Sequence, residues 1–193
     1  MRMDTPLKRI CVFCGSSLGT HFEYREKVRE LGTVLAESAV TLVYGGGSVG
    51  LMGELARSVL ARQGKVIGVI PKRIHEMVES IRLTKLYVVD NMHERKAKMY
   101  ELSDAFIILP GGIGTIEEFF EVYTWYQLGI HLKPIGLLDI NEYFGKLIEF
   151  IDHMVAEGFL KAAHRNTLVI EEDPSTLIAK IRDKEITYID KLK

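Results

Sequence analysis

The sequence of 193 residues has few cysteines, no long apolar run and almost no net charge, and each of these absences narrows the class of protein. Two cysteines are too few for a small secreted scaffold held by disulfides. No apolar stretch approaches the roughly 18 residues that read as a membrane span, and residues 1–4 lack the pattern of a secretory signal. The net charge is −1, and no run of Lys or Arg suggests a nucleic-acid surface. We therefore expect a cytoplasmic protein that binds neither nucleic acid nor membrane.

The two cysteines, Cys11 and Cys14, have the C-x-x-C spacing found in some redox and zinc sites. However, Cys11 lies inside an apolar run, and residues three apart in a strand point to opposite faces of the sheet. No second Cys or His pair completes a set of metal ligands. We interpret both as small buried thiols and predict no metal site.

Apolar residues make up 47% of the chain and charged residues 26%, as in a globular domain with a proper core. Apolar runs typical of buried strands alternate with segments of helical periodicity. The predicted strands are 9–13, 40–44, 65–70, 85–89, 105–109, 134–138 and 167–170, and the predicted helices are 22–38, 49–63, 92–103, 115–126, 143–157 and one from residue 174. This order predicts one doubly wound α/β domain over residues 1–193, with about seven mostly parallel strands.

Local signals mark where some helices start. Thr20 and Glu23 have the spacing of a capping box, and Asp173 before Pro174 is typical of an N-cap. Residues 72–84 are the exception to the alternation, because they are polar and lack clear periodicity. They form either a solvated surface loop or a mobile lid over a binding crevice.

The most informative segment, residues 109–121, reads Leu-Pro-Gly-Gly-Ile-Gly-Thr-Ile-Glu-Glu-Phe-Phe-Glu and follows a predicted strand. It matches neither the G-x-G-x-x-G fingerprint nor a P-loop. Glycine turns also follow the strands at 9–13 and 40–44. Three such turns at strand ends predict one crevice in which backbone N–H groups and a helix N-terminus bind a nucleotide phosphate. The candidate binding residues in these turns are Gly15, Ser16, Gly45, Gly46, Gly47, Gly111, Gly112, Gly114 and Thr115.

Two charged residues near these turns each allow two interpretations. Arg95 lies in the first turn of a predicted helix, where a cation opposes the helix dipole unless an anion lies nearby. That anion is either a ligand phosphate or a neighbouring carboxylate. Glu118 either closes a capping box with Thr115 or serves as a catalytic carboxylate that reaches the sugar of a nucleotide. Glu94 has capping-box spacing from Asn91, and it can also pair with Lys98.

Residues 92–96 (Met-His-Glu-Arg-Lys) together with residues 110–118 resemble the Lonely guy (LOG) family of cytokinin riboside 5′-monophosphate phosphoribohydrolases. Its motif, P-G-G-x-G-T-x-x-E, is matched at every specified position. The resemblance covers nearly the whole chain, including residues 11–17, 44–53, 124–134 and 150–159. It implies a Rossmann-like fold, usually a homodimer. It also implies hydrolysis of the N-glycosidic bond of AMP or a related adenosine 5′-monophosphate.

In this resemblance Arg95 and Glu118 take the positions regarded as catalytic, and Met92 and Lys96 belong to the ligand-lining segment. The products would be the free base and ribose 5-phosphate, and this chemistry requires no metal or redox cofactor. A carboxylate beside the sugar stabilises the oxocarbenium-like charge of N-glycoside cleavage. The dimer expectation is strengthened by the aromatic residues of one predicted helix, Phe119, Phe120, Tyr123, Trp125 and Tyr126.

Two other function classes are weighed against this one. A non-catalytic nucleotide or molybdenum-cofactor carrier could use the same crevice, but it would not need both Arg95 and Glu118. A lysine decarboxylase would hold pyridoxal phosphate on a lysine. The chain is short for that chemistry, and no lysine has a sequence setting that predicts a depressed pKa.

Overall fold

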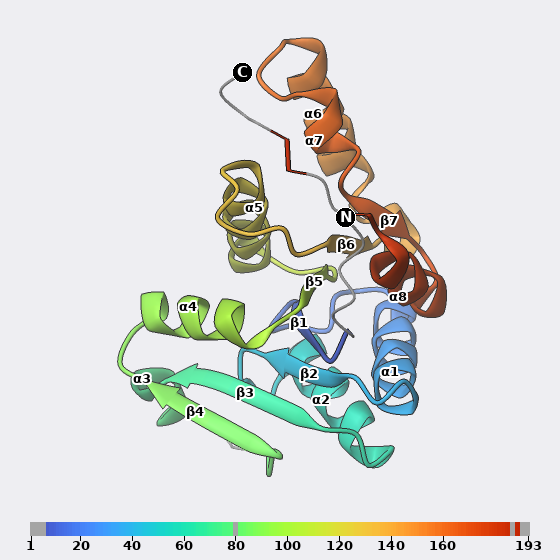
Figure 1. Cartoon of the computed structure of the whole chain (residues 1–193). Coiled ribbons are helices and arrows are strands. Elements are labelled where there is room, and N and C mark those ends of the chain that lie inside the picture. Colours follow the sequence, from blue (N-terminus) through green and yellow to red (C-terminus); the bar gives the residue numbers. More distant parts are fainter. Residues whose placement is uncertain (1–6, 79–80, 186–187, 190–193) are drawn as a thin grey trace.

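A computed structural model describes residues 7–78, 81–185 and 188–189, and its strands form one parallel sheet with helices on both faces (Figure 1). The strands are β1 (Arg9–Phe13), β2 (Thr41–Tyr44), β3 (Val66–Pro71), β4 (Lys85–Val89), β5 (Ala105–Ile108), β6 (Ile135–Leu138) and β7 (Val169–Glu171). The helices are α1 (Phe22–Glu37), α2 (Gly50–Ala61), α3 (Lys72–His75), α4 (Met92–Leu102), α5 (Ile113–Gln127), the short η1 (Ile140–Glu142), α6 (Gly145–Ala156), α7 (Ala162–Arg165) and α8 (Pro174–Asp183). The predicted fold class is confirmed.

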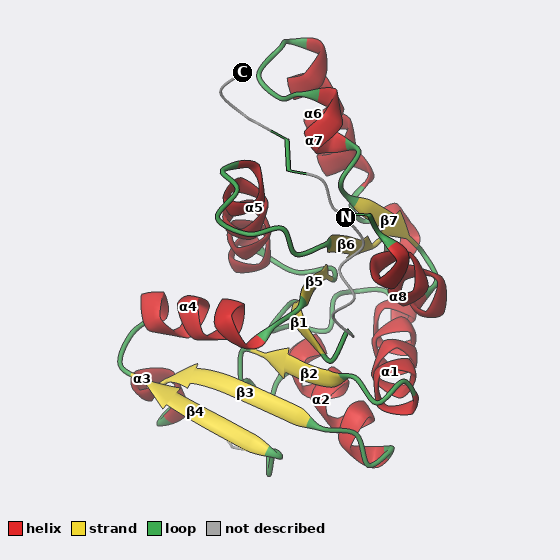
Figure 2. Cartoon of the chain, viewed as in Figure 1, coloured by secondary structure: helices red, strands yellow, loops and turns green. Residues whose placement is uncertain are grey.

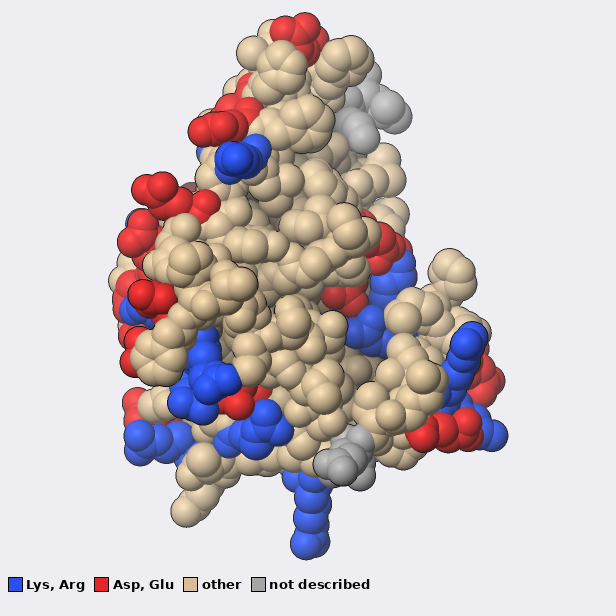
Figure 3. All heavy atoms as spheres, turned by 180° about the vertical axis from the view of Figure 1, so that it is seen from behind, with Lys and Arg blue, Asp and Glu red and all other residues tan. Residues whose placement is uncertain are grey.

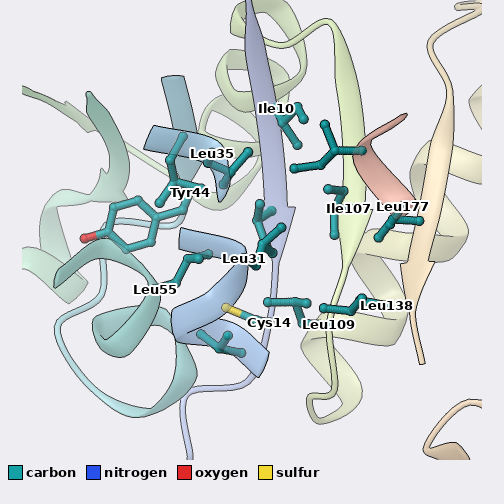
Figure 4. Packing of buried hydrophobic residues seen from close by; sticks show 14 of the residues in the cluster. Ile10, Cys14, Leu31, Leu35, Tyr44, Leu55, Ile107, Leu109, Leu138 and Leu177 are labelled. Atoms are coloured by element: carbon teal, nitrogen blue, oxygen red, sulfur yellow. The ribbon is translucent and has the colours of Figure 1, made fainter. Parts of the chain in front are cut away.

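The core lies in two layers, one on each face of the sheet, because successive side chains of a strand point to opposite faces. Ile10 and Val12 of β1 pack with α1, α2 and α8 (Figure 4). Cys11 and Phe13 pack on the other face with α4, α5 and α6. Cys14 belongs to the first layer, so the two thiols lie on opposite faces as the spacing predicts. Both are buried and free, and burial raises the pKa of each thiol.

The strand order is β4-β3-β2-β1-β5-β6-β7, and all six pairings are parallel. The chain adds β2, β3 and β4 on one side of β1 and then returns to place β5 on the other side (Figure 2). The order therefore reverses between β1 and β5, which is where open parallel sheets bind ligands. Phe13 and Ile108 are register partners, so these two strands end level with each other.

Several predicted helix starts change in the structure. The capping box at Thr20 is wrong, because α1 begins after His21 and no side chain caps it. Asp173 is the N-cap of α8 as predicted, and its carboxylate accepts a hydrogen bond from the Thr176 N–H at 2.7 Å. The helix predicted over 143–157 is α6, which begins two residues later at Gly145. The short η1 precedes it, and its residues Asn141 and Glu142 have positive φ angles.

The polar stretch after β3 is partly ordered by packing. It begins with the short helix α3, which has no buried residue, and later Ile81 and Leu83 pack against the core. Residues 79–80 lie outside the described part of the chain. The segment is therefore more than a solvated loop, while its role as a lid stays a prediction.

Charged side chains are mixed over the molecular surface. On the face in Figure 3, Lys and Arg lie among Asp and Glu and do not form a continuous basic surface. Within the described residues, every helix is too short or too polar to cross a membrane.

Candidate functional site

The glycine turns that follow β1, β2 and β5 meet at the carboxyl edge of the sheet, next to the point where the strand order reverses. The Gly15 N–H donates to the Pro110 carbonyl at 3.0 Å, which joins the first turn to the third. The Met52 N–H donates to the Gly15 carbonyl at 3.3 Å, which joins the second turn to the first. Gly50 allows this contact, because it has a φ of +59° and a Cβ there would lie 2.2 Å from the Ser16 carbonyl carbon. The predicted convergence of the three turns is confirmed.

The three glycines of the third turn have two different roles. At Gly111 a Cβ would lie 2.2 Å from the Thr115 Oγ1, so this glycine is required by packing, and Thr115 is buried beneath it. At Gly112 and Gly114 a Cβ would meet nothing within 4 Å. Gly112 is the N-cap of α5 and offers no side-chain cap. The Thr115 N–H donates to the Gly112 carbonyl at 3.0 Å, so it is the N–H groups of Ile113 and Gly114 that are left without an intrahelical partner. The open space beside them is suited to an anion.

The second turn is shaped mainly by the protein itself. Gly46 has a φ of +76°, and a Cβ there would lie 2.9 Å from the Ile70 side chain. At Gly47 a Cβ would lie 2.9 Å from the end of the Met52 side chain. Both glycines are therefore explained by local packing, whether or not they also contact a ligand. Ser16, in the first turn, is exposed.

Arg95 and Glu118 form a buried ion pair at the edge of these turns. Arg95 extends from the first turn of α4, and its Nη1 lies 2.8 Å from the Glu118 Oε1 of α5. The two side chains are only 13% and 10% exposed. The Met92 sulfur, 3.2 Å from the same nitrogen, lies at the exposed rim. Gly45 leaves room for this arrangement, because a Cβ there would lie 2.1 Å from the Arg95 Nη2.

The ion pair bears on the interpretations left open for its two residues. The anion beside Arg95 in this structure is a neighbouring carboxylate. The capping interpretation of Glu118 is wrong, because α5 begins two residues before Thr115 and the carboxylate of Glu118 binds Arg95. Burial raises the pKa of Glu118 above its ordinary value, and the charge of Arg95 partly opposes that rise. The site therefore holds a carboxylate in an environment that does not favour its charge.

Lys96 lies on the neighbouring side of α4 and binds two carboxylates of α5. Its Nζ is 2.6 Å from the Glu117 Oε1 and 2.8 Å from the Glu121 Oε1. Burial acts to lower the pKa of Lys96, but the hydrogen bonds to both glutamates outweigh burial and raise it. Two adjacent residues of α4 thus each bind α5 through an ion pair.

The start of α4 has the first hydrogen bond of the predicted capping box, while the return bond from Glu94 goes to the Asp90 N–H and not to the Asn91 N–H. Asn91 is its N-cap and accepts a hydrogen bond from the Glu94 N–H at 2.9 Å. The Glu94 carboxylate in turn accepts from the Asp90 N–H at 3.1 Å. The predicted pairing of Glu94 with Lys98 is wrong, since Lys98 binds Glu101 at 3.0 Å.

One residue that contacts the glycine turns is absent from the sequence prediction. Tyr143 follows β6, and its hydroxyl donates a hydrogen bond to the Gly111 carbonyl. These residues are 32 positions apart, and no short-range pattern connects them. The only available signal is that β6 neighbours β5 in the sheet, so that their carboxyl ends lie close together.

The expectation that no lysine has a depressed pKa is wrong for Lys133. This side chain is half-buried, donates to the Tyr100 carbonyl at 2.6 Å and lies 3.8 Å from the centre of the Tyr100 ring. Burial lowers its pKa. However, Lys133 precedes β6, at the amino edge of the sheet and opposite the crevice. It therefore gives no support to a Schiff-base site in the crevice.

The described residues include no group of three or more His, Cys, Asp and Glu placed to hold a metal ion.

Comparison with known proteins shows the family. The family model described as "Possible lysine decarboxylase" matches residues 52–181. A cytokinin riboside 5′-monophosphate phosphoribohydrolase of Arabidopsis thaliana is 46% identical over 184 residues, covering 95% of this chain and 86% of the relative. A protein of the same name from Rhodococcoides fascians is 48% identical over 177 residues, covering 91% of this chain and 89% of the relative.

Solved structures of lower identity share the fold. The molybdenum cofactor binding protein of Rippkaea orientalis has a TM-score of 0.70 and 21% identity, covering 93% of this chain and 98% of that one. The Moco carrier protein of Chlamydomonas reinhardtii has a TM-score of 0.68 and 20% identity, covering 91% and 96%. Because these identities are low, the two likenesses concern the fold alone. The family model and the close relatives together show that the chain belongs to the LOG family of cytokinin riboside 5′-monophosphate phosphoribohydrolases.

Proposed function

We propose that the protein hydrolyses the N-glycosidic bond of AMP or of N6-modified adenosine 5′-monophosphates, including cytokinin riboside monophosphates. The products are the free base and ribose 5-phosphate. The observation that carries the proposal is the buried Arg95–Glu118 pair beside the glycine turns. The names of the relatives from Arabidopsis thaliana and Rhodococcoides fascians support the same reaction.

The catalytic step in this proposal centres on Glu118. The bond between C1′ and the base nitrogen breaks, its electron pair leaves with the base, and positive charge develops on the sugar ring. The Glu118 carboxylate stabilises that charge and orients a water molecule. The water oxygen then bonds to C1′, and one water proton balances the charge on the departing base. Arg95 partly opposes the rise in the Glu118 pKa that burial causes, and in this proposal it also contacts the substrate.

The phosphate of the substrate is assigned to the glycine turns. The open space beside Gly112 and Gly114, together with the N-terminus of α5, is the site proposed for the 5′-phosphate. Other proposed contacts come from the turns after β1 and β2 and from the start of α4, namely Gly15, Ser16, Gly45, Gly46, Gly47, Met92, Lys96, Gly111 and Thr115.

The test is the release of free base from matched substrates. AMP and N6-isopentenyl AMP are incubated with the protein, and adenine and isopentenyladenine are separated by chromatography. Adenosine serves as the control, because it carries the same glycosidic bond without the phosphate. We expect kcat/KM for AMP to exceed that for adenosine by about 10² or more, since remote binding energy supports catalysis. Equal hydrolysis of both would contradict the proposal.

A non-catalytic nucleotide or molybdenum-cofactor carrier is the alternative. It shares the fold of the Rippkaea orientalis and Chlamydomonas reinhardtii proteins, but their identities of 21% and 20% carry no function to this chain. A carrier would bind AMP without releasing adenine, so the same assay separates the two functions.

We also propose that the protein is a cytoplasmic homodimer. The aromatic residues of α5 support this less than expected, because Phe119, Tyr123 and Tyr126 are buried within the single chain. Stronger support comes from Phe150 on α6 and Phe159 just after it, which are 55% and 86% exposed. Sedimentation that shows only a 21.9 kDa species at micromolar concentration would contradict the dimer.

A further inference from the structure

The turn between β6 and α6 has an unusual backbone for its residues. Asn141 has φ 53° and ψ 42°, and Glu142 has φ 54°, so two successive residues with side chains occupy the left-handed region. Such conformations persist only where the surroundings hold them, and they cluster at functional sites. Here the Asp139 carboxylate accepts a hydrogen bond from the Phe144 N–H at 2.7 Å and closes the turn.

This turn places Tyr143 against the third glycine turn. The Tyr143 hydroxyl donates to the Gly111 carbonyl. Its ring is held from two sides by edge-to-face contacts, with centroids 5.9 Å from Tyr24 and 5.0 Å from Phe144. The side chain is still 40% exposed, so the hydroxyl lies at the rim of the crevice rather than in the core.

The hydrogen bond has a consequence for the next N–H group. The peptide that joins Gly111 and Gly112 is trans. In a trans peptide the C=O and the N–H point in opposite directions. Fixing the Gly111 carbonyl on Tyr143 therefore points the Gly112 N–H away from Tyr143. Glycine needs such a restraint more than other residues, because its backbone samples more conformations.

We propose that Tyr143 is a positioning residue that orients the Gly111–Gly112 peptide so that its N–H faces the 5′-phosphate of the substrate. The inference rests on the proposed function, because it assigns the phosphate to this turn. Tyr143 acts through the peptide and does not touch the reacting atoms. The strained turn and the aromatic contacts serve to hold its hydroxyl in place.

The experiment compares Tyr143→Phe with the parent protein. The variant keeps the ring contacts and removes the hydroxyl alone. We expect KM for AMP and Kd for ribose 5-phosphate, measured by calorimetry, to rise about three- to tenfold, as for loss of one hydrogen bond. We expect kcat to stay within about twofold, and binding of adenine and the melting temperature to stay unchanged. If Tyr143 only supported the fold, its loss would lower the melting temperature and would not weaken phosphate binding selectively.

Tyr24→Phe is the matched control, because it removes a hydroxyl from the adjacent ring and leaves the Tyr143–Gly111 bond in place. It should bind ribose 5-phosphate like the parent. The inference is overturned if Tyr143→Phe binds ribose 5-phosphate as tightly as the parent, or if Tyr24→Phe weakens binding by the same factor. Failure of the parent to release adenine from AMP would instead refute the proposed function. If the parent also failed to bind ribose 5-phosphate, both proposals would be overturned.

Discussion

Replacing Glu118 by Gln tests whether its carboxylate performs the reaction or only pairs with Arg95. Gln has the same shape and keeps an oxygen that can accept the hydrogen bond from the Arg95 Nη1, now 2.8 Å from Glu118. What it removes is the negative charge. The substitution therefore separates the chemistry of the residue from its place in the packing.

The effect on turnover follows from the loss of that charge beside an oxocarbenium-like sugar. Removing one preorganised electrostatic group from an active site lowers kcat by about 10² to 10³, or about 3–4 kcal/mol of transition-state stabilisation. At 10% exposure the Glu118 side chain is shielded from water, so we expect the full effect. AMP should still bind, because the proposed phosphate contacts are backbone groups of the glycine turns.

The effect on stability should be small. Burial raises the pKa of Glu118, which means that its surroundings disfavour the anion, and a neutral side chain avoids that penalty. The loss of ionic attraction to Arg95 acts in the opposite direction, so we expect a net change within about 1 kcal/mol, or about 2–4 °C in melting temperature. Glu118→Ala, by contrast, leaves a buried guanidinium without its acceptor. It should destabilise the fold by about 3 kcal/mol, or about 6–12 °C.

The assay combines adenine release from AMP, AMP binding by calorimetry and thermal unfolding. Glu117→Gln is the matched control, since it removes the preceding carboxylate of the same helix, which is 53% exposed and pairs with Lys96. It should keep kcat within about threefold. If Glu118→Gln turned over AMP at the parent rate, the mechanism would have the wrong carboxylate. If Glu117→Gln then lost activity, Glu117 would take its place.

Three further predictions concern the same pair of helices. Burial raises the pKa of Glu118, and only the ionised carboxylate is active. The kcat should therefore fall with decreasing pH, with a midpoint above the ordinary Glu pKa of about 4.3. Arg95→Met should move this acid limb of the pH profile to higher pH. Gly45→Ala should lower kcat/KM for AMP by about 10- to 100-fold with little change in melting temperature, because its Cβ would displace only the end of the flexible Arg95 side chain. Lys96→Met should lower the melting temperature by about 2–4 °C and reduce kcat less than Glu118→Gln does, because its carboxylate partners are partly exposed.

Each of these predictions has an outcome that contradicts it. An acid limb at or below the ordinary Glu pKa would show that burial does not control the active carboxylate. Parent-like kinetics of Gly45→Ala would mean that the position of the Arg95 guanidinium is not critical. If Lys96→Met left stability unchanged but weakened AMP binding, the role of Lys96 would be to contact the substrate and not to join α4 to α5 through its ion pairs.

The sequence by itself determined the architecture and the place of the site. Strand and helix periodicities are local properties, so the seven strands and the six longer helices could be predicted with end-points shifted by a few residues. The short helices α3, η1 and α7 were not predicted, because elements of three or four residues are too short to show a periodicity. The glycine turns could be located for the same reason, since each directly follows an apolar run. Arg95 and Glu118 were identified through short motifs that resemble those of a family.

Only the tertiary structure decided what the individual side chains contact. Arg95 meets Glu118 across 23 residues of sequence, and Tyr143 meets Gly111 across 32, because α4, α5 and the turn after β6 converge at one edge of the sheet. Spacing cannot identify such partners, since it describes neighbours within one element. The capping interpretation of Glu118 failed for the same reason. The helix starts at Ile113, where the turn packs on the strand edge, and that start leaves the carboxylate directed at Arg95 instead of at its own backbone.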